Sequence, residues 1–93
     1  MLSKIPTNLE KSSKEDIDKQ VLRLGIIAEL DAINLYEQLA SMTSNEDIKK
    51  VLKDIADEEK THVGEFQAML LKLDKKQGEE LKKGEGEVKE LTE

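Results

Sequence analysis

The sequence predicts an all-α fold, a two-helix antiparallel hairpin that dimerises into a four-helix bundle. Three observations support this fold class. The 93 residues include one proline, 37% hydrophobic residues and 39% charged residues, a composition typical of long helices with solvated faces. Two long segments repeat their apolar residues with helical periodicity, and a short polar stretch at 43–45 separates them. No segment alternates polar and apolar residues as a half-buried strand does.

The first helix is expected to begin near residue 13 and to run to about Met42. Ser12 with Glu15, and Ser13 with Asp16, both fit the capping box that starts many helices.

The first helix carries two apolar seams. At 100° per residue from Ile17, one seam lies within about 40° of the origin and the other between about 140° and 180°. The first seam contains Ile17, Val21, Leu24, Ala28, Leu35, Leu39 and Met42, and the second Leu22, Ile26, Ile33 and Ala40. A helix with two seams packs against two neighbours. One is the hairpin partner, and the other has to come from a second chain, which predicts the dimer.

The second helix is expected to begin at Ser44, which has an acidic residue, Asp47, three positions later. It should run to about Lys76, where Gly78 would adopt the left-handed conformation that ends many helices. The predicted organisation is a flexible N-terminal arm (1–12), a helical hairpin (13–77) and an acidic Gly/Glu/Lys tail or linker (78–93).

Two ionisable residues interrupt the apolar seam of the second helix. With Ile48 as origin, Glu59 lies at about 20° and His62 at about 320°, so both share one helical face. Glu29, at the edge of a seam on the first helix, precedes Ser44 by 15 residues, and Glu59 follows it by 15. An antiparallel hairpin therefore brings the two glutamates to one level. Carboxylate and imidazole groups that converge in an apolar interior can ligate a metal ion.

One chain supplies only Glu29, Glu59 and His62, too few donors for a closed site. Two chains related by a twofold axis would supply four glutamates and two histidines, the ligand set of di-iron carboxylate bundles. Oxygen ligands with one imidazole per metal favour iron or manganese, and zinc can compete.

Simpler interpretations of these residues compete with the metal site. Glu59 and His62 could form a buried ion pair that sets the helix register, and Glu29 could pair with a lysine of a neighbouring chain. Tyr36, seven residues after Glu29, could be a packing aromatic, and Asp31 a solvated or paired carboxylate.

Two segments carry a family resemblance. AELDAINLYEQ (28–38) and DEEKTHVGEF (57–66) resemble the ferritin-like and rubrerythrin-like superfamily, and more narrowly the encapsulated ferritins. The resemblance covers roughly residues 14–76. It implies a ferritin-like four-helix bundle in which Glu29, Glu59 and His62 of two protomers are the ferroxidase ligands, with Tyr36 beside the centre.

The resemblance also implies a function and partners. Encapsulated ferritins oxidise Fe(II) to Fe(III) with dioxygen at a di-iron site, their dimers assemble into a ring, usually a decamer, and an encapsulin shell stores the mineral. Of the carboxylate pair that forms an outer metal-attracting site in this family, Asp31 is present, whereas Ala28 occupies the other position. Leu35 stands where some members have tryptophan. The tail shows no recognisable apolar shell-targeting peptide. Either it is a linker to a shell domain, because some members are fused to their shell protein, or loading into the shell works differently.

Composition excludes several classes of function. The absence of cysteine excludes disulfides, thiolate metal sites and rubredoxin-type domains. A net charge of -6 and 2% aromatic residues argue against a nucleic-acid partner. Apolar runs too short to span a membrane and an N-terminus without a signal peptide predict a cytoplasmic protein, inside an encapsulin nanocompartment by resemblance.

Other functions compete with the ferroxidase. They are a rubrerythrin-like di-iron peroxidase, a metal-independent helical assembly or adaptor module, and a metal store without turnover. Metal content and oxygen consumption would distinguish them.

Overall fold

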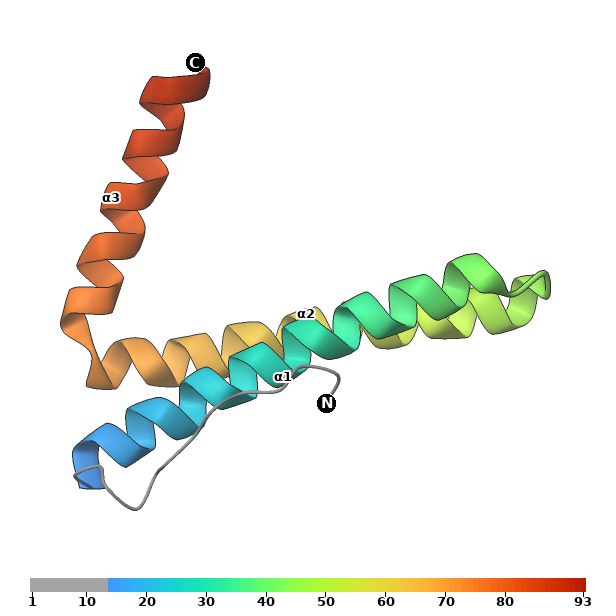
Figure 1. The fold of residues 1–93 in the computed structure, drawn as a ribbon, viewed down its shortest axis with the longest axis horizontal. Helices are drawn as coiled ribbons and strands as arrows, with labels where there is room; N and C mark the ends of the chain where they lie inside the picture. The colour runs from blue at the N-terminus through green and yellow to red at the C-terminus, as the bar shows by residue number, and fades with distance from the viewer. Residues whose placement is uncertain (1–13) are drawn as a thin grey trace.

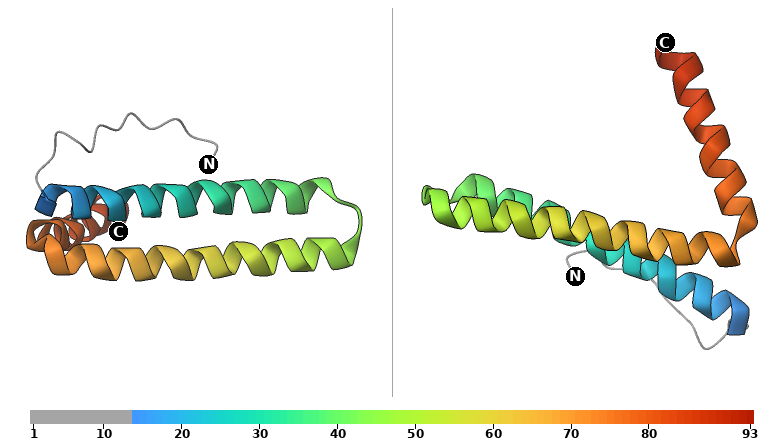
Figure 2. Two further views of the ribbon diagram at one scale, coloured as in Figure 1. Left: turned by 90° about the horizontal axis from the view of Figure 1, so that it is seen from below. Right: turned by 180° about the vertical axis from the view of Figure 1, so that it is seen from behind.

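The computed structural model describes residues 14–93, and all regular structure in that range is helical. Helix α1 spans Lys14–Met42, α2 spans Glu46–Leu73 and α3 spans Lys75–Thr92. Helices α1 and α2 lie antiparallel, side by side, and α3 projects steeply from the end of α2 (Figures 1 and 2). The predicted all-α class and helical hairpin are therefore confirmed. The N-terminal arm at 1–12 and the capping serines, Ser12 and Ser13, lie outside the described residues.

The turn between α1 and α2 occupies the polar stretch that the sequence indicated, but its cap differs. Asn45, not Ser44, is the N-cap of α2. Its Oδ1 accepts hydrogen bonds from the backbone N–H groups of Asp47 at 3.0 Å and Ile48 at 3.1 Å. These bonds satisfy two of the amides that a helix start leaves unpaired. The predicted start at Ser44 was wrong by one residue, because an asparagine one position later makes an equally good cap.

The other end of α2 departs further from expectation. Asp74 ends α2 and begins α3: its backbone N–H donates to the Leu70 carbonyl at 2.9 Å, and its Oδ1 accepts from the Gln77 N–H at 3.1 Å. Gly78 lies inside α3, and no glycine of residues 14–93 has a positive φ. The left-handed cap at Gly78 and the extension of α2 to Lys76 were therefore wrong. A capping aspartate restarts the helix before the glycine is reached.

The predicted tail at 78–93 is helical in the structure, as the greater part of α3. Its division from the hairpin as a separate tail or linker stays a prediction, because helical conformation alone does not determine what the segment connects.

The core between α1 and α2 is thin. Its buried hydrophobic residues are Ile33 and Ala40 on α1 and Ala56 and Leu70 on α2. Ile33 and Ala40 belong to the same predicted seam, so this seam is the one that packs within the hairpin. The two alanines let the helices approach closely near the turn.

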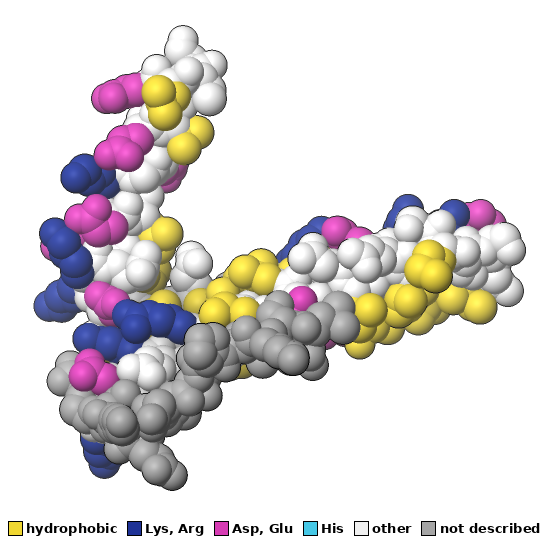
Figure 3. All heavy atoms as spheres, in the orientation of Figure 1, with side chains coloured by type: hydrophobic (Ala, Val, Ile, Leu, Met, Phe, Trp, Pro, Cys, Tyr) yellow, Lys and Arg dark blue, Asp and Glu magenta, His cyan; other side chains and the backbone are white. Residues whose placement is uncertain are grey.

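The other apolar seam of α1 is partly exposed in the part of the chain that the structure describes. Its exposed members on α1 are Val21, Leu39 and Met42, and the exposed members of the single seam of α2 are Ile48, Val51, Met69 and Leu73. We call this set the open apolar face. Figure 3 shows hydrophobic side chains gathered along one edge of the hairpin, with charged side chains along the opposite edge. A contiguous exposed apolar surface indicates an interaction site. The dimer that would cover it stays a prediction.

An ion pair joins the start of α3 to α1. Arg23 of α1 donates through Nη2 to Asp74 Oδ2 at 3.0 Å. The Gln77 N–H, and then the Arg23 guanidinium, hold the pKa of Asp74 below its ordinary 3.8, although partial burial opposes the shift. Among residues 14–93, α3 makes few other contacts with α2, so we expect its direction to depend on Asp74.

We expect Asp74→Ala to loosen the base of α3, because it removes both the cap and the ion pair. Amide hydrogen exchange at residues 75–80 should speed up, whereas exchange in the middle of α1 should not change. Asp74→Asn keeps an oxygen for the Gln77 amide but loses the charge, so its effect should be intermediate.

Acid should mimic the asparagine variant. A lowered folded-state pKa means that this stabilisation is present above pH about 4 and is lost as the pH falls through the lowered pKa. Equal exchange rates in all three proteins at neutral pH would show that Asp74 does not position α3.

Candidate metal centre

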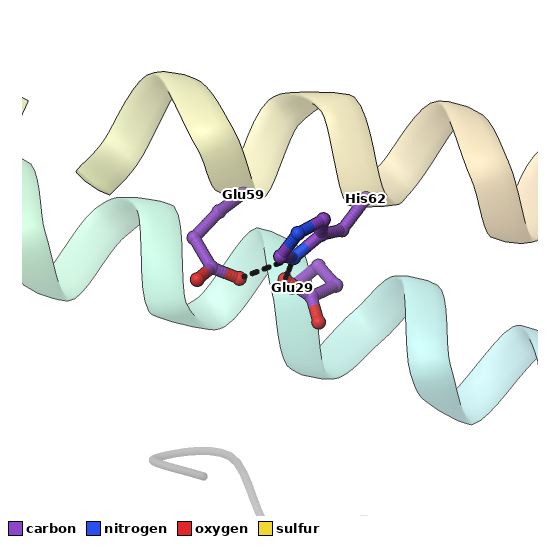
Figure 4. Close-up of side chains that lie close together, drawn as sticks. All are labelled: Glu29, Glu59 and His62. Carbon is purple, nitrogen blue, oxygen red and sulfur yellow. Dashed lines mark hydrogen bonds and ion pairs between the residues drawn. The ribbon is translucent and has the colours of Figure 1, made fainter. Parts of the chain in front are cut away.

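Three residues from two helices meet near the middle of the hairpin. Glu29 comes from α1, and Glu59 and His62 come from consecutive turns of α2 (Figure 4). His62 Nδ1 lies 3.3 Å from Glu29 Oε2 and 3.5 Å from Glu59 Oε2. One ligand atom from each residue lies within 4.8 Å of the others. The convergence predicted from the sequence is present, and the metal role of these residues stays a prediction.

A close contact between Gly25 of α1 and Phe66 of α2 lies one turn from the cluster. Gly25 lies one turn before Glu29, and Phe66 one turn after His62. A Cβ atom built on Gly25 would lie 3.1 Å from the Phe66 ring. The missing side chain therefore lets the ring lie against α1, and the next turn brings Glu29 opposite His62. The sequence predicted that Glu29 would lie opposite Glu59. In the structure, the Glu29 carboxylate instead forms a hydrogen bond with His62, one turn further along α2.

The cluster is partly covered by the hairpin and open on one side. The side chains of Glu29 and Glu59 are 20% and 19% exposed, and that of His62 is 46% exposed. A shallow cavity of about 280 Å³ lies beside them, lined by Glu29, His62, Glu65 and Phe66. His62 and the exposed Met69 point in similar directions from α2, about 20° apart at 100° per residue. The open side of the cluster therefore borders the open apolar face.

The electrostatics of the cluster favour a cation. No lysine or arginine among residues 14–93 forms an ion pair with Glu29 or Glu59, whose partner in both cases is His62. Two carboxylates this close repel each other when both are ionised. Two carboxylate oxygens and one imidazole nitrogen are donors suited to Fe(II), Mn(II) or Zn(II). The residues thus fit half of a carboxylate-rich metal centre.

The remaining predicted site residues lie apart from the cluster. Tyr36 is half-buried, about two turns along α1 from Glu29, and no hydrogen bond within residues 14–93 joins it to the three. Asp31 is not among the residues whose ligand atoms converge. Sequence reasoning overlooked Glu65, which lines the cavity. Its spacing of three residues from His62 was the available signal.

Comparison with known proteins adds an independent observation. The family model for rubrerythrin matches residues 20–93. The chain belongs to the rubrerythrin family. Proteins of this family are generally di-iron, which agrees with the donors that Glu29, Glu59 and His62 offer.

Similar proteins narrow the resemblance to encapsulated ferritins, as the sequence predicted. A ferritin-like–encapsulin shell fusion protein of Pyrococcus furiosus is 56% identical over an alignment of 95 residues. The alignment covers 99% of this chain and 27% of that protein. The encapsulin nanocompartment cargo protein EncC of Myxococcus xanthus is 39% identical over 71 residues, 76% of this chain and 55% of its own length. This rubrerythrin-family chain thus spans only part of the curated relatives it matches.

A solved structure matches the fold closely. The crystal structure of the encapsulated ferritin domain from Pyrococcus furiosus superposes with a TM-score of 0.85 at 54% identity, and the match covers 99% of this chain and 96% of that one. The match includes α3, so the projecting helix belongs to the shared fold.

We expect Glu59→Gln to stabilise the metal-free protein and to remove its stabilisation by divalent cations. The amide can still accept from His62, but the repulsion with Glu29 is gone, which is worth on the order of 1 kcal/mol. Thermal unfolding at pH 8, with chelator and then with Mn(II), measures both effects.

The neighbouring Glu58→Gln is the matched control, because Glu58 is exposed and outside the cluster. Equal cation stabilisation of wild type and Glu59→Gln would remove Glu59 from the site.

Proposed function

We propose that this chain is a ferroxidase that oxidises Fe(II) to Fe(III) with dioxygen at a di-iron site shared between two protomers. The observation that carries the proposal is the convergence of Glu29, Glu59 and His62 beside an exposed apolar face, with no lysine or arginine of residues 14–93 paired to either glutamate. Iron is the substrate, and the three side chains are the ligands that hold it during oxidation.

Two chains are needed because one hairpin provides half of the donors. A twofold contact through the open apolar face would bury that face and bring two clusters together. The joint site would then hold four carboxylates and two imidazoles, enough to bind two iron ions. The acidic surroundings of this contact oppose dimerisation until cations offset the charge, so iron binding and assembly are coupled.

The chemistry requires two reducing equivalents in one place. Two Fe(II) ions held side by side each supply one electron to dioxygen. The carboxylates offset the charge of the ferric product, and the imidazole of His62 has to be neutral to ligate, so acid weakens binding. In this proposal Tyr36 lies beside the joint centre, and Asp31 is an outer carboxylate that attracts iron on its way to Glu29.

The relatives support a location and a partner. One similar protein joins a ferritin-like part to an encapsulin shell in one chain, and two others are encapsulin nanocompartment cargo proteins. We infer that this chain works in the cytoplasm inside an encapsulin compartment, where the shell stores the oxidised iron. None of the three described helices is both long and apolar enough to cross a bilayer.

We expect Glu59→Ala and His62→Ala each to abolish rapid iron oxidation. Aerobic Fe(II) oxidation near neutral pH, followed by absorbance beside a protein-free control, measures the rate. In the wild type the fast phase should saturate near one iron per chain, because two protomers share two ions. Glu58→Ala should keep the full rate. Fast oxidation in either ligand variant would contradict this site, and no acceleration in the wild type would favour a structural module.

We also expect Fe(II) to promote dimerisation of the wild type, since the ligands lie beside the contact surface. Anaerobic sedimentation velocity with Fe(II) or chelator should show a shift from monomer towards dimer and larger species. His62→Ala should lose most of the shift. Identical profiles with and without iron would disprove the coupling and leave the site itself standing.

A further inference from the structure

The Phe66 ring borders both the other helix of the hairpin and the space beside the metal cluster. A Cβ atom built on Gly25 of α1 would lie 3.1 Å from Cε1 and Cζ of this ring and 3.2 Å from Cδ1. The same ring lines the cavity of about 280 Å³, together with Glu29, His62 and Glu65. Whatever fixes the place of the ring therefore fixes one wall of the cavity at the cluster.

Gly25 stands where alanine would make a more stable helix. Glycine loses more backbone freedom than any other residue when a helix forms, so it is unfavourable in the middle of α1. No glycine among residues 14–93 has a positive φ, so the backbone at Gly25 does not require glycine. A Cβ atom here would be closer to the ring than ordinary van der Waals contact, and the ring would have to give by a few tenths of an ångström. The reason for the glycine is therefore packing, because it leaves room for Phe66.

The cavity is the open space that a displaced ring would enter. Protein interiors are close-packed, so a side chain under steric pressure moves toward a neighbouring void. The void that Phe66 lines is the cavity beside Glu29 and His62. A side chain at position 25 would therefore make this cavity smaller from the side of the ring.

The cavity is also where further ligands of a bound cation would lie. Glu29, Glu59 and His62 offer one donor atom each, and a symmetric dimer keeps this ratio of three side chains to one ion. Zn(II) is satisfied by four ligands in a tetrahedron, whereas Mn(II) takes six and Fe(II) sites keep positions open for oxygen. A water molecule takes up about 30 Å³ of liquid, so the cavity has room for ligands of this size. The exposed carboxylate of Glu65 can accept hydrogen bonds from them.

We propose that Gly25 and Phe66 determine which cation the cluster prefers. With no side chain at Gly25, the ring stays against α1, and the cavity stays large enough for water or dioxygen to complete the coordination of Fe(II) or Mn(II). Both are positioning residues, which act through the size of the cavity. Zn(II), which needs fewer ligands and has no redox chemistry, gains least from this space. This inference rests on the proposed function, since it concerns the positions that the iron ligands leave open.

The ratio of Mn(II) affinity to Zn(II) affinity tests the proposal in the full chain without a measurement of oxidation. Electron paramagnetic resonance of free Mn(II) gives its affinity, and displacement of bound Mn(II) gives that of Zn(II). Gly25→Ala should lower the ratio about fivefold, as moderate overpacking would. Gly64→Ala is the matched control, because Gly64 is also helical and a Cβ atom there would meet nothing within 4 Å. This control should keep the wild-type ratio.

Removal of the ring tests whether Gly25 acts through Phe66. Phe66→Leu shortens the side chain, so it should not lower the ratio. Gly25→Ala added to Phe66→Leu should change the ratio by less than about twofold, because no ring remains to be displaced.

Nuclear magnetic resonance shows the movement of the ring directly. Phe66 and His62 are the only phenylalanine and the only histidine of the chain, so their ring protons are identified by residue type alone. Nuclear Overhauser effects between the two rings should be stronger in cation-free Gly25→Ala than in the wild type, and unchanged in Gly64→Ala.

Four results would overturn the proposal. They are an unchanged affinity ratio in Gly25→Ala, an equal loss in Gly64→Ala, an equal loss after the ring has been removed, and rings that come no closer in Gly25→Ala. Failure of the ferroxidase would look different: both cations would bind and the ratio would shift, but Fe(II) would be oxidised no faster than in the protein-free control. A wild type that binds neither cation would overturn both.

Discussion

Ile33 and Ala40 of α1, with Ala56 and Leu70 of α2, form the buried core that holds the two helices together, and this core uses only one of the two seams of α1. No third helix among residues 14–93 covers the remaining sides of α1 and α2, so the hairpin keeps an open apolar face. The metal cluster lies where the closed and open sides meet. Glu29 and Glu59 are mostly covered, whereas His62 is nearly half exposed. In the proposed function a second chain completes this site, which would couple metal binding to assembly.

The cluster also shows how a small protein tolerates poorly compensated charge. Among residues 14–93, the two carboxylates have His62 as their one ion-pair partner, at a cost that a lysine or arginine would normally offset. The Gly25–Phe66 contact one turn away helps to keep the helices in the register that brings them together. In the rubrerythrin family, which is generally di-iron, this arrangement is naturally explained as one half of an iron site. In the proposed function, the charge that destabilises the hairpin would also attract the cation.

Some features of the chain could be predicted because they depend on local chemistry and period. Helical periodicity located both long helices, and the two charges inside an apolar seam identified Glu59 and His62. Equal distances from the turn were sufficient to add Glu29. The caps were predicted less well, because Asn45 competed with Ser44, and Asp74 restarted the helix before Gly78 could end it. Several residues can cap a helix, and the choice depends on which amides the surrounding fold leaves unpaired.

The amino-acid sequence by itself determined the helical class, the position of the turn and the three side chains that converge, since each follows from 100° per residue and from the solvation cost of charge. The tertiary structure alone decided three other matters. It showed which seam of α1 faces α2, that Arg23 and Asp74 hold the base of α3, and that Lys49 and Lys53 border a groove over two alanines. These depend on the distance and rotation between helices. Side chains 51 residues apart, such as Arg23 and Asp74, set that geometry, and no local pattern encodes it.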